Sequence, residues 1–167
     1  MIPKKFNLFL NHKISEFKKV IDVDSDKSIS IRSFIIGSIS QNKSFVKNVL
    51  ESDDVISTID CLKKLGVRIK KIKPKSYIIF GKGPGSLYAK KNDTLNFGNS
   101  GTLARLLTGV LSTTPDIEIK MRGDKSLNKR SMKKLIEAMS KFGASFLPKY
   151  KFNFPIKLIS SEMPVGI

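Results

Sequence analysis

The stretch SISIRSFIIGSIS (residues 28–40) decides the fold, because a related stretch, SGTLARLLTGVLS, returns at residues 100–112. Three identities fall in register at an offset of 72, namely Ser28 with Ser100, Gly37 with Gly109 and Ser40 with Ser112. Both stretches are apolar on nearly every side, which predicts helices that lie in an interior with sheets outside them.

A second pair of stretches repeats in the same order. VISTIDCLKKLGVRI (55–69) matches MKKLIEAMSKFGASF (132–146) at an offset of 77, with apolar residues facing apolar residues. Two independent helices in one order indicate a duplication. Each unit is predicted to run strand–helix–strand–helix–strand–strand, and the fold class is therefore α/β (α+β), built from layered βαβαββ units.

The elements of the first unit follow from periodicity and helix-stop signals. Strands are expected near 19–23 and 45–50, and two more at 67–72 and 77–80 joined by a turn at 73–76. The second helix is expected to open at Ser52, with Asp53 and Asp54 at the positive end of its dipole, and to stop at Gly66. The predicted division of the chain is an amino-terminal segment 1–21, a first unit 22–81, a connector 82–94, a second unit 95–160 and a further segment 161–167.

Composition narrows the function classes. The chain has 31 Lys plus Arg against 14 Asp plus Glu, a formal charge of +17 spread evenly over both halves, without an aromatic-interleaved basic patch. One Cys and one His exclude an intrachain disulfide and the usual Cys and His metal sites, so no metal is expected. No apolar window is long enough to span a membrane, and no secretory signal is evident, so a cytoplasmic protein is expected.

Two predicted helix starts carry groups that bind anions. At DKSISIR (26–32), Ser28 is expected to cap the helix, with Lys27 and Arg32 beside it. At NFGNSGT (96–102), two glycines let a ligand approach the backbone. The segment RGDKSLNKR (122–130) adds a turn with a dense basic cluster. Its residues alone predict an ordinary solvated loop. The chain has only five arginines, Arg32, Arg68, Arg105, Arg122 and Arg130, and a Lys-rich chain keeps Arg where a planar two-pronged donor is needed.

Four blocks together resemble the 5-enolpyruvylshikimate-3-phosphate synthase family, in the family's order and spacing. They are DKSISIR (26–32), SDDVISTIDCLKKLGV (52–67), LNFGNSGTLARLL (95–107) and RGDKSLNKRSMKKLIEAMSKFGA (122–144). The resemblance implies the enolpyruvyl transferase fold, an inside-out α/β barrel of six βαβαββ units, three to a domain, with helices packed inside. About two of the six units are expected here, as an amino-terminal portion.

The resemblance also implies an activity. The family transfers the enolpyruvyl group of phosphoenolpyruvate to the 5-hydroxyl of shikimate 3-phosphate in the shikimate pathway, without a metal or organic cofactor, and is the target of glyphosate. By the resemblance, Lys27, Ser28 and Arg32 would bind shikimate 3-phosphate. Lys27, Gly101 and Arg130 would bind phosphoenolpyruvate, with Asn99 nearby. The family's acid and base residues would lie beyond Ile167, so the catalytic residues are not assigned. The chain alone is expected to be inactive and to aggregate in solution. A monomer is expected for the complete enzyme, with no nucleic-acid or membrane partner.

Two departures from the family pattern and two alternatives accompany this interpretation. Ser25 stands where the family usually has Gly, which predicts a strained turn if φ is positive there, and Ser131 stands where Pro often follows the phosphoenolpyruvate-binding Arg. A basic polyanion- or nucleic-acid-binding module is the alternative from charge alone. The UDP-N-acetylglucosamine enolpyruvyl transferases are a distant one, because they have Lys-Asn where this chain has Lys27-Ser28.

Overall fold

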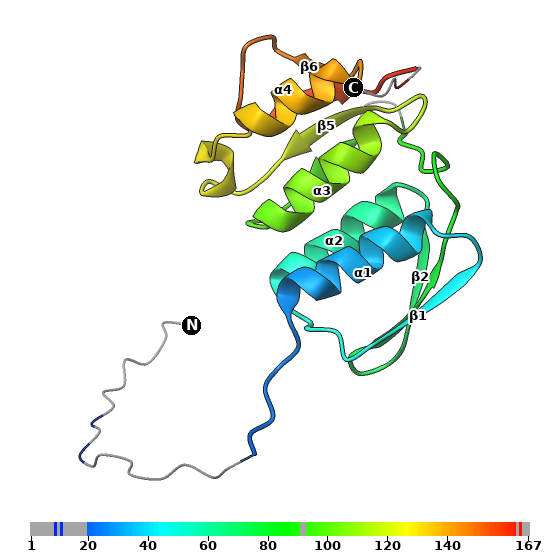
Figure 1. Cartoon of the computed structure of the whole chain (residues 1–167), viewed down its shortest axis with the longest axis vertical. Helices are drawn as coiled ribbons and strands as arrows, with labels where there is room; N and C mark the ends of the chain where they lie inside the picture. Colours follow the sequence, from blue (N-terminus) through cyan, green and yellow to red (C-terminus); the bar gives the residue numbers. More distant parts are fainter. Residues whose placement is uncertain (1–8, 10, 12–19, 91–92, 163, 165–167) are drawn as a thin grey trace.

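The computed structural model describes residues 20–90 and 93–162, together with the single positions 9, 11 and 164. In chain order the elements are α1 (Lys27–Ile39), β1 (Lys43–Lys47), α2 (Asp53–Lys64), β2 (Arg68–Lys73), β3 (Ser76–Phe80), β4 (Thr94–Asn96), α3 (Gly101–Ser112), β5 (Glu118–Arg122), the 3-10 turn η1 (Leu127–Lys129), α4 (Lys133–Lys141), β6 (Ser145–Leu147) and β7 (Ile156–Ile159). Helix α3 lies between α4 and the pair formed by α1 and α2 (Figure 1).

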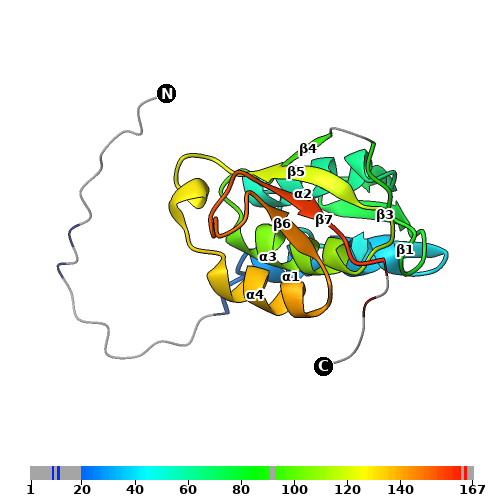
Figure 2. The ribbon, with the colours of Figure 1, turned by 90° about the horizontal axis from the view of Figure 1, so that it is seen from above.

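Each repeat builds its own sheet. The first sheet has the order β1-β3-β2 and is antiparallel throughout. The second has the order β4-β5-β7-β6, in which β4 and β5 run parallel and the other pairs are antiparallel. The view from above shows the strands of the second sheet along one side of α3 and α4 (Figure 2). The α/β architecture of two repeats expected from the sequence is confirmed.

One continuous hydrophobic core joins the two repeats. Ile31 and Phe34 of α1 are fully buried, and Phe34 meets the ring of Tyr77 edge-on at 5.2 Å between centroids. In the second repeat Phe97 and Phe154 make the same kind of contact at 5.4 Å. Helix α1 packs against both α2 and α3, so helices of the two repeats meet in this core.

Helix ends confirm the duplication in detail. Gly66 and Gly143, which align in the two repeats, both have positive φ, at +83° and +94°, just beyond the ends of α2 and α4. This left-handed conformation ends a helix and is open to glycine at little cost. Lys75, in the turn between β2 and β3, also has a positive φ of 55°.

Three local expectations differ from the structure: one strand is not found, one strand is shifted and one helix cap is misplaced. Residues 20–23 form no strand, and position 19 lies outside the described residues. Within the described part of the chain, a leading strand, β4, is found in the second repeat only. The strand expected at 45–50 is β1 at Lys43–Lys47. The cap of α1 is Asp26, whose Oδ1 accepts from the Ile29 backbone N–H at 2.6 Å, so Ser28 lies inside the first turn. A carboxylate two residues earlier competes for the same amides, and its charge favours the helix dipole.

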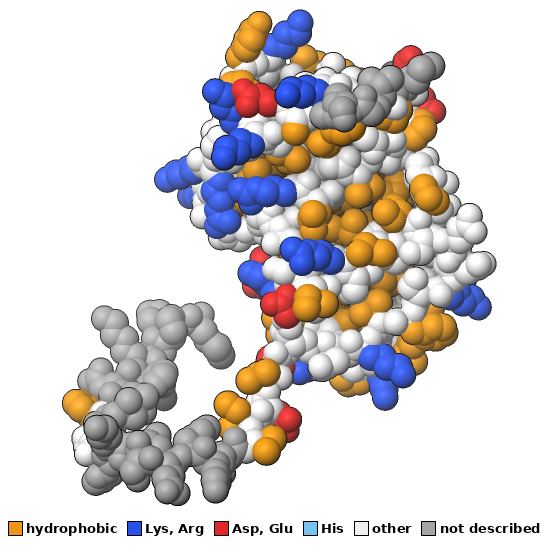
Figure 3. All heavy atoms as spheres, in the orientation of Figure 1, with side chains coloured by type: hydrophobic (Ala, Val, Ile, Leu, Met, Phe, Trp, Pro, Cys, Tyr) orange, Lys and Arg blue, Asp and Glu red, His pale blue; other side chains and the backbone are white. Residues whose placement is uncertain are grey.

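The outer face of the helical layer is apolar. Ile29 and Ile36 of α1 are 65% and 60% exposed, and Leu106 of α3 is partly exposed. Figure 3 shows hydrophobic side chains gathered on this face over α1 and α3. One side of α1 is therefore buried, as its apolar pattern predicts, and its other side exposes apolar side chains in this chain. Among the described residues, no helix has the length and apolar character to cross a bilayer.

Candidate functional site

Parallel pairing of β4 and β5 places two loops at one edge of the second sheet. Asn96 and Arg122, the last residues of the two strands, are in register, and the Phe97 backbone N–H donates to the Arg122 carbonyl at 2.8 Å. The loops that follow therefore leave the sheet side by side. Binding sites collect at such carboxyl edges, because neighbouring loops converge there.

The loop after β4 delivers the start of α3. Gly98 turns the chain with a φ of +55°, and the Asn96 side chain accepts from its backbone N–H at 3.2 Å. Ser100 is fully buried and caps the helix, accepting from Leu103 N–H at 3.2 Å. Gly101 is the first helical residue. This first turn of α3 also carries the positive end of the helix dipole.

The loop after β5 delivers Arg130. The Asp124 backbone N–H donates to the Gly98 carbonyl at 2.8 Å, which ties this loop to the preceding one. The Asp124 side chain accepts from Leu127 N–H at 2.7 Å, and the Asn128 side chain from Gly123 N–H at 2.8 Å. The loop is held by its own hydrogen bonds, so the basic segment 122–130 is an ordered support for Arg130.

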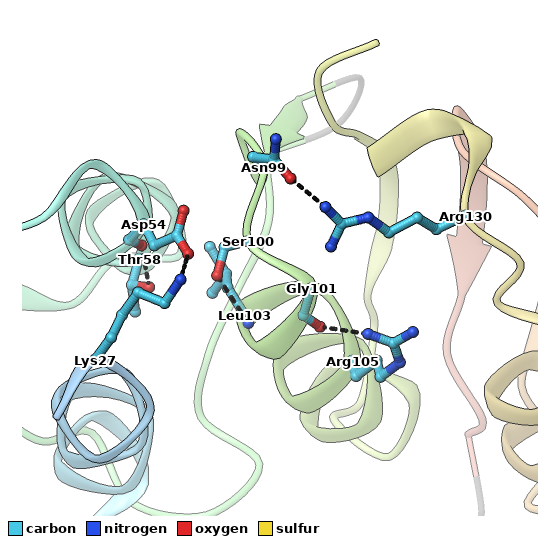
Figure 4. A network of polar contacts seen from close by, with 9 residues as sticks. All are labelled: Lys27, Asp54, Thr58, Asn99, Ser100, Gly101, Leu103, Arg105 and Arg130. Atoms are coloured by element: carbon cyan, nitrogen blue, oxygen red, sulfur yellow. Dashed lines mark hydrogen bonds and ion pairs between the residues drawn. The ribbon is translucent and has the colours of Figure 1, made fainter. Parts of the chain in front are cut away.

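These elements meet α1 and α2 around one cavity of about 320 Å³. It is lined by Lys27, Asp54, Asn99, Gly101, Thr102, Arg105 and Arg130. Figure 4 shows Lys27 and Asp54 on one side of the start of α3 and Arg130 on the other. Three cations and one carboxylate line the cavity, so its net charge favours an anion of phosphate or carboxylate type.

Each cation in the cavity has a partner in the structure. Lys27 Nζ lies 2.8 Å from Asp54 Oδ2. Arg130 Nη2 donates to Asn99 Oδ1 at 2.6 Å, and Arg105 Nη1 donates to the Gly101 carbonyl at 3.2 Å (Figure 4). Since each guanidinium carries five N–H donors, both arginines keep donors for a ligand.

The sequence prediction places Lys27, Asn99, Gly101 and Arg130 at the site, and the structure brings all four together. Ser28 and Arg32 do not line the cavity. Ser28 is half-buried and Arg32 is exposed one helical turn further along α1. Their assignment to shikimate 3-phosphate remains a prediction.

Sequence reasoning missed Asp54, Thr102 and Arg105 as cavity residues. The sequence predicted Asp54 at the positive end of the α2 dipole, and it does lie in that first turn. Its second place, as a residue that lines the cavity, was not predicted. Arg105 had a usable signal, since it is one of five arginines and stands four residues, or one helical turn, after Gly101.

The two residues that depart from the family pattern, Ser25 and Ser131, do not line the cavity. Ser25 is not among the non-glycine residues with positive φ, so the strained turn expected there is not found; its side-chain oxygen is buried without a hydrogen-bond partner. Ser131 accepts from the Lys133 backbone N–H at 3.3 Å at the start of α4.

Cys61 lies outside the cavity, on the core side of α2. Burial raises the pKa of its thiol to about 12, and the sulfur contacts the Asn96 carbonyl at 3.4 Å. A thiol in this state is a poor nucleophile. Among the described residues, no group of three or more His, Cys, Asp or Glu side chains could hold a metal ion.

Comparisons with known proteins identify a family that most of the chain matches. Residues 11–163 match the family described as EPSP synthase (3-phosphoshikimate 1-carboxyvinyltransferase). A 3-phosphoshikimate 1-carboxyvinyltransferase from Syntrophomonas wolfei is 34% identical over 95% of this chain and 36% of its own length. One from Caldicellulosiruptor saccharolyticus is 42% identical over 94% of this chain and 38% of its own length.

A solved EPSP synthase from Acinetobacter baumannii superimposes with a TM-score of 0.80 at 33% identity, over 88% of this chain and 33% of that one. The chain therefore spans about a third of the length of the proteins it matches.

Proposed function

The chain belongs to the EPSP synthase family, and on this premise we propose that it binds shikimate 3-phosphate and phosphoenolpyruvate for enolpyruvyl transfer. In that reaction the 5-hydroxyl oxygen of shikimate 3-phosphate bonds to C2 of phosphoenolpyruvate, and the bond from C2 to the phosphate oxygen breaks. Inorganic phosphate leaves. The groups that move the protons are not assigned.

One observation carries this proposal: four residues singled out by sequence converge on one cationic cavity at the start of α3. They come from three segments of the chain. Lys27 and Asn99 are more than 70 residues apart, and Asn99 and Arg130 are about 30 residues apart. Both substrates are polyanions, and cations fixed before the substrate arrives stabilise charge without reorganising. A reaction between two polyanions requires such a site.

Each residue has a role set by its chemistry. Arg130, held by Asn99, presents its remaining guanidinium donors to a carboxylate or phosphate. Lys27 supplies a compact ammonium from the opposite side. Gly101 gives the ligand access to the backbone of α3, since a Cβ there would lie 2.9 Å from Arg105 Nη1 and 3.3 Å from Arg130 Nη1.

Calorimetric titration of phosphoenolpyruvate and shikimate 3-phosphate into the chain tests the proposal. Lys27→Ala and Arg130→Ala should each weaken phosphoenolpyruvate binding by about 10- to 150-fold, because a hydrogen bond to a charged group contributes about 1.5–3 kcal/mol. Lys47→Ala, on exposed strand β1, removes one positive charge away from the cavity and serves as the control. Unchanged binding in both cavity variants would refute the proposal.

Gly101→Ala tests the cavity by adding one methyl group without removing a charge. The backbone tolerates alanine, because Gly101 is helical, but the new methyl displaces the two guanidinium groups. We expect weaker phosphoenolpyruvate binding and, by the family resemblance, a higher glyphosate concentration for competition. Gly109→Ala on the same helix has only Met139 Sδ at 4.0 Å and should change neither.

A second candidate, polyanion binding, is favoured by the outer face of the first sheet. Register pairs Lys43 with Phe80 and Phe80 with Arg68, whose guanidinium carbon lies 3.6 Å from the Phe80 ring centroid. In the next row on this face Phe45, which is 64% exposed, and Lys70 lie on either side of Ile78. The linear sequence showed no such patch, since its members come from three strands.

Salt and mutation separate the two candidates. If this face binds nucleic acid, the chain should bind a single-stranded oligonucleotide with an affinity that falls steeply as ionic strength rises. Phe45→Ala should abolish this binding. Oligonucleotide binding unaffected by Phe45→Ala would remove this surface as its site.

A further inference from the structure

Asp54 is the one carboxylate among the described residues that line a cavity with three cations. A role in stabilising the dipole of α2 does not explain why its side chain lies in this cavity. Its neighbour Asp53 lies in the same first turn and is exposed, as a residue serving only the helix dipole would be. The Asp54 side chain is 17% exposed and lies against Lys27, whose side chain is 49% exposed. The carboxylate is therefore the more enclosed partner of the pair.

The pair joins two helices that are far apart in sequence. Lys27 is the first residue of α1, and Asp54 belongs to the first turn of α2. Val55 next to Asp54 is fully buried, as is Ile31 one turn after Lys27, so packing of the two helices fixes both ends. The position of the carboxylate is set by the core rather than by the flexible lysine.

The other two cations are held differently. Arg105 and Arg130 donate to a backbone carbonyl and to an amide oxygen, which are neutral acceptors. A lysine has a four-carbon stem and three freely rotating donors, so it needs a fixed acceptor to keep its ammonium in one place. One donor directed to Asp54 leaves two for a ligand in the cavity.

We propose that Asp54 is a positioning residue that holds the Lys27 ammonium at the anion cavity, a role that rests on the proposed function. Coulomb's law and positioning predict opposite results when the carboxylate is neutralised. Removing a negative charge raises the net positive charge of the cavity and by itself would tighten anion binding. Loss of positioning weakens it, because the ammonium becomes free to leave the cavity.

The test compares Asp54→Asn with Asp53→Asn, which makes the same charge change in the same helical turn. Two quantities are measured on the full chain: the rate at which acetic anhydride acetylates Lys27 without ligand, followed by peptide mass spectrometry, and the affinity for phosphoenolpyruvate. Thermal melts of both variants report any general loss of structure. If Asp54→Asn does not fold, Asp54→Glu keeps the charge and shifts the carboxylate by one methylene.

Asp54→Asn should raise the Lys27 acetylation rate and weaken phosphoenolpyruvate binding, each by about 2- to 5-fold, the effect of a partly exposed ion pair. Asp53→Asn should change neither, and Asp54→Glu should give a smaller change in the same direction. Equal acetylation rates in the two Asn variants, or tighter phosphoenolpyruvate binding in Asp54→Asn, would overturn the proposal.

If the wild-type chain itself fails to bind phosphoenolpyruvate, the proposed function fails. The acetylation rates then decide alone whether Asp54 holds Lys27.

Discussion

The second helices of the two repeats, α2 and α4, have matching sequences and different surroundings. Helix α2 buries Val55, Thr58, Ile59, Cys61 and Leu62. Among the residues of α4, all of which the structure describes, only Ile136 is buried. The same amphipathic pattern therefore yields two very different degrees of burial.

The neighbours of each helix explain the difference. Helix α2 lies against α1 and against β4 of the following repeat, where Lys64 Nζ donates to the Thr94 carbonyl at 2.9 Å. Helix α4 packs on α3 and β6, and its other side borders an open, mostly apolar cavity of about 1000 Å³ between α4, β6 and the loop 149–152. An amphipathic pattern sets which residues can be buried, and the next element in space decides which are.

The largest effect on stability is expected when aligned residues of α2 and α4 are truncated to alanine. Leu62→Ala should lower the free energy of unfolding by about 2–5 kcal/mol, because Leu62 is fully buried. Met139, its counterpart at the offset of 77, is partly buried, and Met139→Ala should cost about 1 kcal/mol or less. Urea denaturation monitored by circular dichroism gives both values. Similar losses would mean that α4 is covered as fully as α2 in solution.

Thiol reactivity probes the same two positions directly. Cys61 aligns with Ala138, which lines the cavity beside α4. Since burial raises the Cys61 pKa to about 12, native Cys61 should react with a disulfide reagent at least about 100-fold more slowly than the new thiol in Ala138→Cys. Release of the coloured thiolate at pH 8 measures both rates, with the denatured protein as the reference. Rapid labelling of the unmodified chain would contradict the buried environment of α2.

The aligned glycines of the first helices extend the comparison. A Cβ at Gly37 would lie 2.8 Å from Ile79 Cδ1, whereas one at Gly109 would touch only Met139 Sδ at 4.0 Å. Gly37→Ala should therefore destabilise the protein by about 1–3 kcal/mol. Gly109→Ala should be neutral or stabilise it by up to about 1 kcal/mol, because alanine favours the helix. Thermal melts of the two variants check the difference in sign, and a stabilising Gly37→Ala would show that α1 can move away from its sheet.

The smallest expected effect concerns a carboxylate network of the first repeat. Glu51 accepts from Lys71 Nζ at 3.0 Å, from the Tyr77 hydroxyl at 2.7 Å and from the Lys75 backbone N–H at 3.1 Å. These bonds, the one from Lys71 above all, lower the pKa of Glu51 from 4.5 to about 2. Because the folded-state pKa is depressed, the contribution to stability is present above pH 4.5 and is lost as pH falls toward 2.

Glu51→Gln should accordingly lower stability at neutral pH and converge with the wild type near pH 2. Tyr77→Phe, which removes one donor, should show a weaker form of the same dependence. Urea midpoints measured from pH 2 to 7 test this, and a pH-independent difference between wild type and Glu51→Gln would exclude the network as its cause.

Local sequence features predicted the helices, their stops and two anion-binding helix starts, whereas Arg130 entered the predicted site only through the family resemblance. The ends of α2 and α4 are marked by Gly66 and Gly143, because a positive φ is a property of a single residue. Lys27 and Gly101 were found because helix starts bind anions through their own backbone. The cap of α1 was misplaced, since Asp26 and Ser28 are both good capping residues and only the chain path chooses between them.

By itself the sequence determined the duplicated α/β pattern, the apolar helices and the family to which the chain belongs. Only the tertiary structure decided that Asp54 and Arg105 share a cavity with Lys27 and Arg130. It also decided that α4 stays open where α2 is covered. The physical reason is that capping and periodicity act within a few residues, whereas the cavity depends on parallel pairing of β4 with β5 and on packing of α1 against α2 and α3.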